Sequence, residues 1–333
     1  MHIAILGAGA WGTALACALA PRHPTMLWAR DAAQAAAMAR ARRNDRYLPG
    51  YCFPGSLQIG ADLAAALRHA QDGGPDGLVF LACPTESLRE LLQSVRAHQH
   101  SGAVSWLCKG LERASGLLAH EIAAIELPGV DAGPLTGPSF ADEVVRGMPT
   151  ALVVAGTPAL CERVTRAVHA SNLRVYSSDD VVGAEVGGAV KNVLAIATGI
   201  GDALQLGLNA RAALITRGLA ETRRLGEALG ANGETFTGLT GLGDLILTCT
   251  GDLSRNRRIG LALGRGVALD AAVAQLGHVA EGVWSAPAIV ARAHKLGVEM
   301  PICEAVCAVL DERTSARAAV ERLLSRDPRA ERS

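Results

Sequence analysis

The stretch MHIAILGAGAWGTALACALA, residues 1–20, decides the fold of this chain. It opens with the apolar run HIAIL, which is typical of a buried strand, and closes with the helix pattern TALACALA. Between them, Gly7, Gly9 and Gly12 form a GxGxxG turn. In such a setting the first glycine allows a tight turn, the second lets a pyrophosphate approach the backbone, and the third packs the helix on the sheet. The stretch therefore predicts a dinucleotide-binding α/β unit of the Rossmann type.

The alternation of strand and helix patterns continues through the first half of the chain. Further strand-like runs lie at residues 25–30, 77–84, 103–110, 133–139, 150–156 and 173–177. Strands that alternate with helices form parallel sheets covered on both faces. We therefore expect a parallel-sheet α/β fold, with residues 47–55 (YLPGYCFPG) as a loop because they are rich in Pro and Gly.

The pattern changes near residue 180. From Val181 onward the sequence has helical periodicity and glycine-punctuated loops, and no run with clear strand character. We expect a Rossmann-type dinucleotide-binding domain at residues 1–180. An all-α substrate-binding domain is expected at residues 181–333, joined to the first by the helix with which it begins.

Composition and charge restrict the classes of partner. Lys+Arg and Asp+Glu each number 32, so the net charge is zero and no basic field attracts nucleic acid or an anionic membrane. The most apolar region, 181–206, is interrupted by Glu185, Lys191 and Asp202, and we expect no integral membrane segment. The 8 cysteines form no CxxC pair, which favours free thiols in a reducing cytoplasm and no metal site.

The end of the second strand bears on the choice of cofactor. NAD enzymes carry an acidic residue there for the ribose 2′-hydroxyl, whereas this chain has Arg30 followed by Asp31. Arg30 can pair with the 2′-phosphate of NADPH, and Asp31 can cap the next helix. We favour NADPH as the cofactor, and NADH stays open.

Two segments follow strands at the edge where sheets of this kind bind their ligands. Lys109 ends the run AVSWLCK, where its ammonium can face a phosphate or the nicotinamide; the alternative is an ordinary surface lysine. The loop TGPSF (136–140) follows another strand and offers backbone N–H groups and a hydroxyl to a small polar ligand.

A lysine lies inside the apolar helix pattern GGAVKNVLAIATGIG (187–201). Burying a charge without a partner costs several kcal/mol, so Lys191 either reaches the surface or provides an ammonium in a pocket. Asp244, between glycine turns and an apolar stretch, is the expected partner. Gly187 and Gly188 leave room for another body to approach. We favour an active-site ammonium.

The segment SRNRRIG (254–260) predicts an anion site. Ser254 is placed as the N-cap of a helix whose first turn carries Arg255, Asn256 and Arg257. Free N–H groups, the helix dipole and a guanidinium together favour an anion such as a phosphate. The alternative is a solvated basic helix start.

Together these segments resemble the bacterial NAD(P)-dependent glycerol-3-phosphate dehydrogenases over nearly the whole chain. The matching blocks are GAGAWGTAL, LPGYCFP, CKGLE, LTGPSFADEV, GGAVKNVLAIATGI, AALITRGLAE, TGLGDLILTCTGDLSRNRRIGLALG and VAEGVWSA. The resemblance implies reduction of dihydroxyacetone phosphate to sn-glycerol 3-phosphate by NADPH, which supplies glycerol phosphate for phospholipid synthesis.

The resemblance also implies roles for individual residues. Lys191 is implied as the proton donor or acceptor, with Asp244 and Lys109 beside it in the catalytic group. The implied substrate contacts are Lys109, Gly137, Ser139, Lys191, Asp244, Ser254, Arg255 and Asn256. The cofactor contacts, including the turn glycines, are Gly7, Gly9, Trp11, Gly12, Arg30, Lys109, Ala141, Arg255, Val279 and Glu281.

Two positions depart from the family pattern. Ala10 stands where the family more often has a hydroxyl residue, so one side-chain contact to the cofactor is expected to be missing. GLNAR (207–211) replaces a more usual GDNAK and affects no catalytic residue.

Two other functions stay open alongside this resemblance. One is a β-hydroxyacid dehydrogenase of the 6-phosphogluconate dehydrogenase type, which also uses a helix lysine; the SRNRR and TGLGDL segments favour glycerol phosphate over it. The other is a non-catalytic NADPH-binding regulator, which would need neither Lys191 nor Asp244. The expected partner is a phosphorylated triose, and a homodimer is an open expectation.

Overall fold

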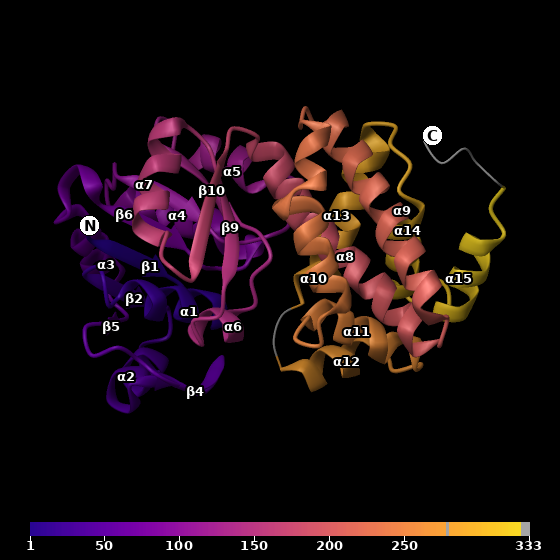
Figure 1. Cartoon of the computed structure of the whole chain (residues 1–333), viewed down its shortest axis with the longest axis horizontal. Helices are drawn as coiled ribbons and strands as arrows, with labels where there is room; N and C mark the ends of the chain where they lie inside the picture. The colour runs from indigo at the N-terminus through magenta and orange to yellow at the C-terminus, as the bar shows by residue number, and fades with distance from the viewer. Residues whose placement is uncertain (278–279, 328–333) are drawn as a thin grey trace.

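The structure, a computed structural model, describes residues 1–277 and 280–327 of the chain. A sheet with its covering helices takes up the first part of the chain, and a group of helices takes up the rest (Figure 1). The expected Rossmann-type α/β fold followed by an all-α part is thus confirmed.

The sheet has 8 strands in the order β10-β9-β8-β7-β6-β1-β2-β5. These strands are β1 (Ile3–Leu6), β2 (Thr25–Trp28), β5 (Gln58–Gly60), β6 (Leu78–Leu81), β7 (Ala103–Trp106), β8 (Ala132–Thr136), β9 (Thr150–Ala155) and β10 (Leu173–Ser178). From β5 through β8 all neighbouring strands pair in parallel, as the alternation of strands and helices predicts.

Helices cover both faces of this sheet. They are α1 (Ala10–Leu19), α2 (Ala32–Ala41), α3 (Leu63–Gln71), α4 (Leu88–Ala97), α5 (Ala119–Glu126), α6 (Ala141–Val145) and α7 (Pro158–Val168), with short 3₁₀ turns η1 (Gly74–Asp76) and η2 (Thr85–Ser87). Ile3 and Ile5 join the apolar core that includes α1 and α7, whereas Ala4 and Leu6 join the core that includes α3, α4 and α5. Because both faces of β1 are buried, its sequence is apolar throughout.

One pairing departs from the parallel arrangement that the sequence predicts. β9 runs antiparallel to β8, with Leu135 opposite Val154, and β10 runs parallel to β9. The only helix between β8 and β9 is α6, whose 5 residues rise only about 7.5 Å. A crossover to a parallel strand needs a longer connection, so the chain stays at the same edge and returns in the opposite direction.

The segment expected as a Pro- and Gly-rich loop contains a short antiparallel hairpin. β3 (Arg43–Asn44) pairs with β4 (Leu48–Cys52), so the interpretation of residues 47–55 as loop is wrong in part. Pro49 lies within β4, and proline is tolerated there because a two-stranded ribbon has free edges.

The second part of the chain consists of helices in the order in which they occur. They are α8 (Val181–Ala203), α9 (Gly207–Ala228), α10 (Asp244–Thr250), α11 (Arg255–Gly264), α12 (Leu269–Leu276), α13 (Glu281–Lys295), α14 (Pro301–Leu310) and α15 (Ala316–Leu324). Two short turns, η3 (Gly233–Thr237) and the π-helical η4 (Leu239–Gly243), precede α10. No strand follows β10 in the residues that the structure describes.

The central helix of this part is α8, against which α9, α10, α11, α13 and α14 pack (Figure 1). By length and composition it could cross a membrane, but 89% of its apolar window is buried inside the protein. A Cβ added at Gly199 of α8 would lie 2.1 Å from the Arg257 carbonyl oxygen, and one at Gly260 of α11 would lie 2.1 Å from the Ile196 carbonyl oxygen. Glycine at both positions therefore lets the backbones of α8 and α11 touch.

The room left by Gly187 is also filled from within the chain. A Cβ at Gly187 would lie 2.3 Å from the Thr240 carbonyl oxygen, so the body that approaches this glycine is η4. Because α10 begins directly after η4, its first residue, Asp244, lies close to the face of α8 that carries Lys191.

Candidate active site

The glycine turn has the geometry that a phosphate cradle requires. Gly7 has φ +127°, and a Cβ there would lie 2.4 Å from the Ala82 carbonyl oxygen, so no other residue fits without distortion. A Cβ at Gly12 would meet the Gly7 carbonyl oxygen at 2.1 Å, which explains why the third glycine lets α1 pack against the turn. Gly9, the N-cap of α1, faces open space, with nothing within 4 Å of an added Cβ.

Asn44, which sequence reasoning missed, holds this turn from the β3–β4 hairpin. Its buried amide nitrogen donates to the Ala8 carbonyl oxygen at 3.0 Å and to the Thr13 hydroxyl at 2.8 Å. Because residues 47–55 were expected to be a loop, the sequence did not predict the hairpin that brings Asn44 beside the turn.

Of the two roles considered for the acidic residue after β2, contact with a ribose hydroxyl or capping of the next helix, Asp31 has the second. Its carboxylate accepts hydrogen bonds from the backbone N–H groups of Ala33 and Gln34, at 2.8 and 3.2 Å, and so caps α2. Arg30 is exposed at the end of β2. The acidic side chain at this position is therefore engaged by the helix end, while the guanidinium faces solvent.

The centre of the candidate site is a carboxylate shared by two lysines. Asp244 Oδ1 accepts a hydrogen bond from Lys191 Nζ at 2.6 Å, and Asp244 Oδ2 accepts one from Lys109 Nζ at 2.7 Å. Lys109 Nζ also donates to the Gly137 carbonyl oxygen at 2.9 Å. The side chain of Asp244 is 1% exposed and that of Lys191 is 9% exposed. The structure thus brings together three segments that are far apart in the sequence.

Burial controls the charges of this group. Burial lowers the pKa of Lys191 to about 8; Lys109 adds to the effect, and Asp244 opposes it. Burial alone would raise the pKa of Asp244, but the ammonium groups of Lys109 and Lys191 outweigh it and hold that pKa below its ordinary value. At neutral pH the group therefore has an ionised carboxylate and a lysine that is close to its titration point.

Two further polar side chains complete the surroundings of Lys191 and were missed from the sequence. The Thr248 hydroxyl, one turn after Asp244 on α10, accepts a hydrogen bond from Lys191 Nζ at 2.9 Å. Asn192, next to Lys191, donates to the Lys109 carbonyl oxygen at 3.1 Å. Thr248 could have been found from its spacing, because it follows Asp244 by one helical turn.

Asn256 links α11 to two neighbouring elements. Its amide nitrogen donates to Asn192 Oδ1 at 2.9 Å, and its amide oxygen accepts from the Gly282 backbone N–H at 3.0 Å. A Cβ at Gly282 would lie 2.6 Å from the Asn192 carbonyl oxygen, so α13 begins in direct contact with α8. Asn256, expected from the resemblance as a substrate contact, has these protein partners already.

The predicted helix cap at Ser254 is present. The Ser254 hydroxyl accepts from the Arg257 backbone N–H at 3.2 Å and is buried. Arg255, the first residue of α11, is exposed. The guanidinium of Arg257 is occupied, because it donates to Asp202 at 3.0 Å and to Asp252 at 2.8 Å. Of the two arginines that open the predicted basic helix start, Arg255 is therefore the one turned to solvent.

The remaining predicted residues lie on elements around this group. Ser139 donates to the Gly137 carbonyl oxygen at 3.1 Å in the loop after β8. Trp11 is half-buried in the first turn of α1, and Ala141 begins α6. Glu281 begins α13; burial raises its pKa, and the positive charge of Arg255 opposes the rise most strongly. Val279 lies outside the described residues.

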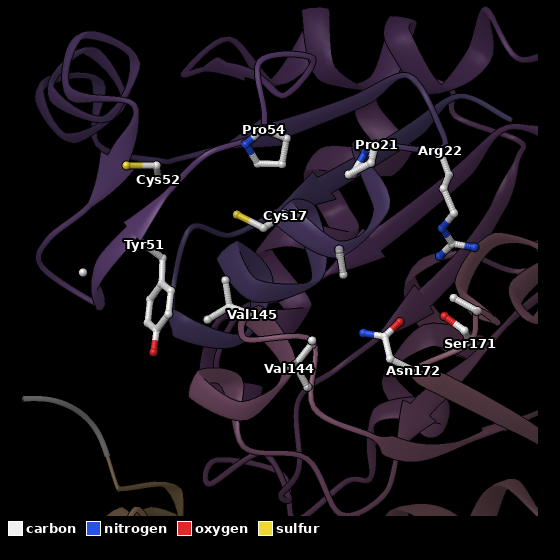
Figure 2. A pocket seen from close by; sticks show the side chains of 14 residues that line it. Cys17, Pro21, Arg22, Tyr51, Cys52, Pro54, Val144, Val145, Ser171 and Asn172 are labelled. Atoms are coloured by element: carbon white, nitrogen blue, oxygen red, sulfur yellow. The ribbon is translucent and has the colours of Figure 1, made fainter.

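A separate hollow of about 440 Å³ lies between α1, the β3–β4 hairpin and α6 (Figure 2). At its rim the Tyr51 hydroxyl donates to Asp142 Oδ1 at 2.7 Å, and Arg146 Nε donates to the Tyr51 oxygen at 2.6 Å. These bonds fasten the hairpin to α6. None of the residues that line the hollow belongs to the predicted site, so the hollow is a different feature of the surface.

Comparison with known proteins matches both parts of the chain to one family. The model for the N-terminus of NAD-dependent glycerol-3-phosphate dehydrogenases matches residues 2–160, and the model for their C-terminus matches residues 180–321. The chain belongs to the NAD-dependent glycerol-3-phosphate dehydrogenase family. It is therefore an NAD(P)-dependent oxidoreductase, and the family that its sequence blocks resemble is confirmed.

Close relatives within the glycerol-3-phosphate dehydrogenase family are bacterial. The chain is 59% identical to a glycerol-3-phosphate dehydrogenase (NAD(P)+) of Methylibium petroleiphilum, over 99% of this chain and 98% of the relative. It is 56% identical to one of a Janthinobacterium species, over 99% of both chains. The crystal structure of glycerol-3-phosphate dehydrogenase from Coxiella burnetii is similar with a TM-score of 0.93 and 42% identity, covering 97% of this chain and 98% of that one.

Membership of the glycerol-3-phosphate dehydrogenase family decides among the functions left open by the sequence. The β-hydroxyacid dehydrogenase of the 6-phosphogluconate type and the non-catalytic regulator are both set aside, because the family match covers both parts of the chain and the relatives are named as enzymes.

Proposed function

We propose that this chain reduces dihydroxyacetone phosphate to sn-glycerol 3-phosphate with NADPH, with NADH as a second cofactor, and that Lys191 is the proton donor. The observation that carries the mechanism is the buried Lys191–Asp244–Lys109 group. The family to which the chain belongs supports the reaction, and the bacterial relatives of the chain are named glycerol-3-phosphate dehydrogenase. The product is the glycerol phosphate from which phospholipids are built.

The residues of the glycine turn fit a dinucleotide. Gly9 has open space where a side chain would project, and Gly9 begins a helix whose first N–H groups have no side-chain cap. A pyrophosphate can therefore approach this turn, with Trp11, Arg30, Ala141 and Glu281 as proposed further contacts, and Val279 as a contact outside the described residues. The bound cofactor supplies the hydride.

Lys191 is well suited to provide the proton. Reduction of a ketone develops negative charge on its oxygen, and a positioned ammonium both stabilises this charge and protonates it. With a pKa of about 8, Lys191 is charged at neutral pH and gives up its proton more readily than an ordinary lysine. Asp244 holds the two ammonium groups side by side, and Lys109 adds positive charge next to the reacting oxygen.

The phosphate of the substrate is proposed to lie at the start of α11. The capped helix end offers free N–H groups and the positive end of the dipole, and Arg255 adds an exposed guanidinium. Ser254 and Asn256 border this helix start, and Gly137 and Ser139 are proposed contacts from the loop after β8.

We assign residues 1–180 to cofactor binding and residues 181–333 to substrate binding, a division supported by the start of α8 at Val181. The cysteines in the described residues are all free, which supports a reducing cytoplasm as the location. A homodimer stays a prediction.

The test follows NADPH absorbance with dihydroxyacetone phosphate in the wild type and in Lys191→Ala. The variant is expected to bind NADPH normally and to lose turnover by about 10²-fold or more, because its proton donor is gone. Turnover of Lys191→Ala within a few-fold of the wild type would remove Lys191 from the mechanism. Absence of NADPH oxidation by the wild type would refute the reaction itself.

A further inference from the structure

A buried carboxylate joins α8 to the sheet at some distance from the lysine group. Glu185, in the second turn of α8, is 7% exposed. Its Oε1 accepts from the Trp106 indole N–H at 2.9 Å and from the His120 backbone N–H at 3.0 Å. Its Oε2 lies 2.6 Å from His120 Nδ1. One side chain of α8 thus holds the last residue of β7 and the first turn of α5.

The position of this carboxylate in the chain connects it to both lysines. Trp106 ends β7, and Lys109 follows in the segment that leaves this strand. Glu185 precedes Lys191 on the same helix by fewer than two turns. On the other side of Lys191, Asn192 donates to the Lys109 carbonyl oxygen at 3.1 Å. The segment from β7 is therefore bonded to α8 both before and after Lys191.

The lysine group depends on this register. Lys191 lies on α8 and Lys109 lies in the segment that follows β7, and they donate to different oxygens of Asp244, at 2.6 and 2.7 Å. A slide of α8 along the strand would lengthen one of these bonds, and displacements of about 1 Å at a reacting group can cost about 10²-fold in rate.

We propose that Glu185 is a positioning residue for catalysis, which sets α8 against the end of β7 so that Lys191 and Lys109 meet at one carboxylate. This inference rests on the proposed role of Lys191. Glu185 touches neither lysine and acts only through the elements that carry them.

The charges around Glu185 come from α5 and α13. His120 on α5 faces Glu185 directly. Glu121 on α5 and Arg292 on α13, which pair with each other at 2.7 Å, act on His120. Burial raises the pKa of Glu185, while His120 and the Trp106 N–H oppose the rise. Two of its three hydrogen bonds are donated by groups that do not titrate, the Trp106 indole and the His120 backbone, so they persist in either protonation state.

The experiment compares Glu185→Leu with a matched control, Glu221→Leu. Glu221 on α9 is also buried and accepts backbone N–H groups, from Ile302 and Cys303 at 2.7 and 3.2 Å, but it lies in the helical part and touches no proposed site residue. The measurements are kcat and KM for NADPH, the dissociation constant of NADPH, and the pH dependence of kcat.

Glu185→Leu is expected to lower kcat by about 10- to 100-fold while the dissociation constant of NADPH stays within about two-fold. In the wild type kcat is expected to fall near pH 8, where Lys191 loses its proton. In Glu185→Leu this fall should occur at a higher pH, because the displaced ammonium becomes hydrated and its pKa rises. Glu185→Gln keeps an acceptor oxygen for Trp106 and the His120 backbone, and should restore kcat to within a few-fold of the wild type. Glu221→Leu should lose stability but keep the wild-type kcat and pH profile.

A folded Glu185→Leu variant with the wild-type kcat and pH profile would overturn the inference, and so would a Glu221→Leu control with the same kinetic defect. If Glu185→Leu does not fold, Trp106→Phe decides, because it removes the indole donor and keeps an aromatic ring. A several-fold fall in its kcat with unchanged NADPH binding supports the inference, and an unchanged kcat overturns it. Lys191→Ala in the same assays separates the two proposals: full turnover there refutes the role of Lys191, whatever Glu185 does.

Discussion

Among single residues, Lys191 has the strongest link between environment and chemistry. Its ammonium is held by Asp244 and Thr248, and burial brings its pKa to about 8. Reduction needs the protonated lysine, so kcat for dihydroxyacetone phosphate should fall as the pH rises through about 8. Oxidation of glycerol 3-phosphate needs the neutral lysine, so its kcat should fall as the pH drops below about 8.

The measurement is kcat in both directions between about pH 6 and pH 10. Lys191→Ala serves as the control, since its residual rate should lack both of these dependences. A wild-type reduction rate that is flat across this range would contradict the assignment of Lys191 as the acid.

Arg30 bears on cofactor choice. It is exposed at the end of β2, while the neighbouring Asp31 is engaged as the cap of α2. Arg30→Ala should raise KM for NADPH by about ten-fold or more, since a charge-assisted hydrogen bond is worth roughly 1.5–3 kcal/mol. KM for NADH should change little, because NADH has no 2′-phosphate. Equal increases in both constants would show that Arg30 contacts a part that the two cofactors share.

Among the elements, the start of α11 carries the prediction about substrate phosphate. Arg255→Ala should lower kcat/KM for dihydroxyacetone phosphate strongly and affect dihydroxyacetone little, because only the first has a phosphate for the guanidinium to hold. Binding energy from this phosphate also promotes reaction at the carbonyl, so kcat should fall as well. Ser254→Ala should act in the same direction but more weakly, through loss of the cap on the Arg257 N–H.

The quantity to compare is the ratio of kcat/KM for the two ketones. Arg258→Ala, on an exposed position of the same helix, is the matched control and should leave the ratio unchanged. A wild-type ratio in Arg255→Ala would place the phosphate elsewhere.

For the whole molecule, a buried carboxylate makes stability depend on pH. Glu221 joins α9 to the start of α14, and burial raises its pKa from 4.5 to about 7, against the opposing hydrogen bonds from Ile302 and Cys303. Between about pH 4.5 and pH 7, Glu221 therefore keeps its proton in the folded state and has lost it in the unfolded state. The stabilisation is complete below about pH 4.5 and is lost as the pH rises through about 7.

The expected loss is on the order of 3 kcal/mol of unfolding free energy, at about 1.36 kcal/mol per pKa unit. Urea unfolding at a series of pH values measures it, and the comparison is the wild type minus Glu221→Gln, because other groups titrate in the same range. This difference should change between about pH 4.5 and pH 7. If the difference in unfolding free energy stayed constant over this pH range, Glu221 would be ionised in the folded protein across the whole range.

Some features of this molecule follow from short stretches of sequence alone. The strand, the GxGxxG turn and α1 could be predicted because each pattern is local: apolar runs, positions that admit only glycine, and helical periodicity. Ser254 as a cap and Asp31 as a cap belong to the same class, since a cap bonds to N–H groups only two or three residues away. Lys191 could be singled out because a charge in an apolar helix demands a partner.

Other features were decided only by the tertiary structure. β9 runs antiparallel to β8 because the connection between them, through α6, is too short for a crossover. The hairpin that brings Asn44 to the glycine turn depends on pairing between segments without a strong strand pattern. Lys109 and Lys191 meet at Asp244 because the sheet, α8 and α10 pack together, and the lowered pKa of Lys191 comes from the burial that this packing creates. The physical reason is range: sequence patterns report on neighbours along the chain, whereas the hydrogen bonds and burial of this site join residues that only the folded chain brings into contact.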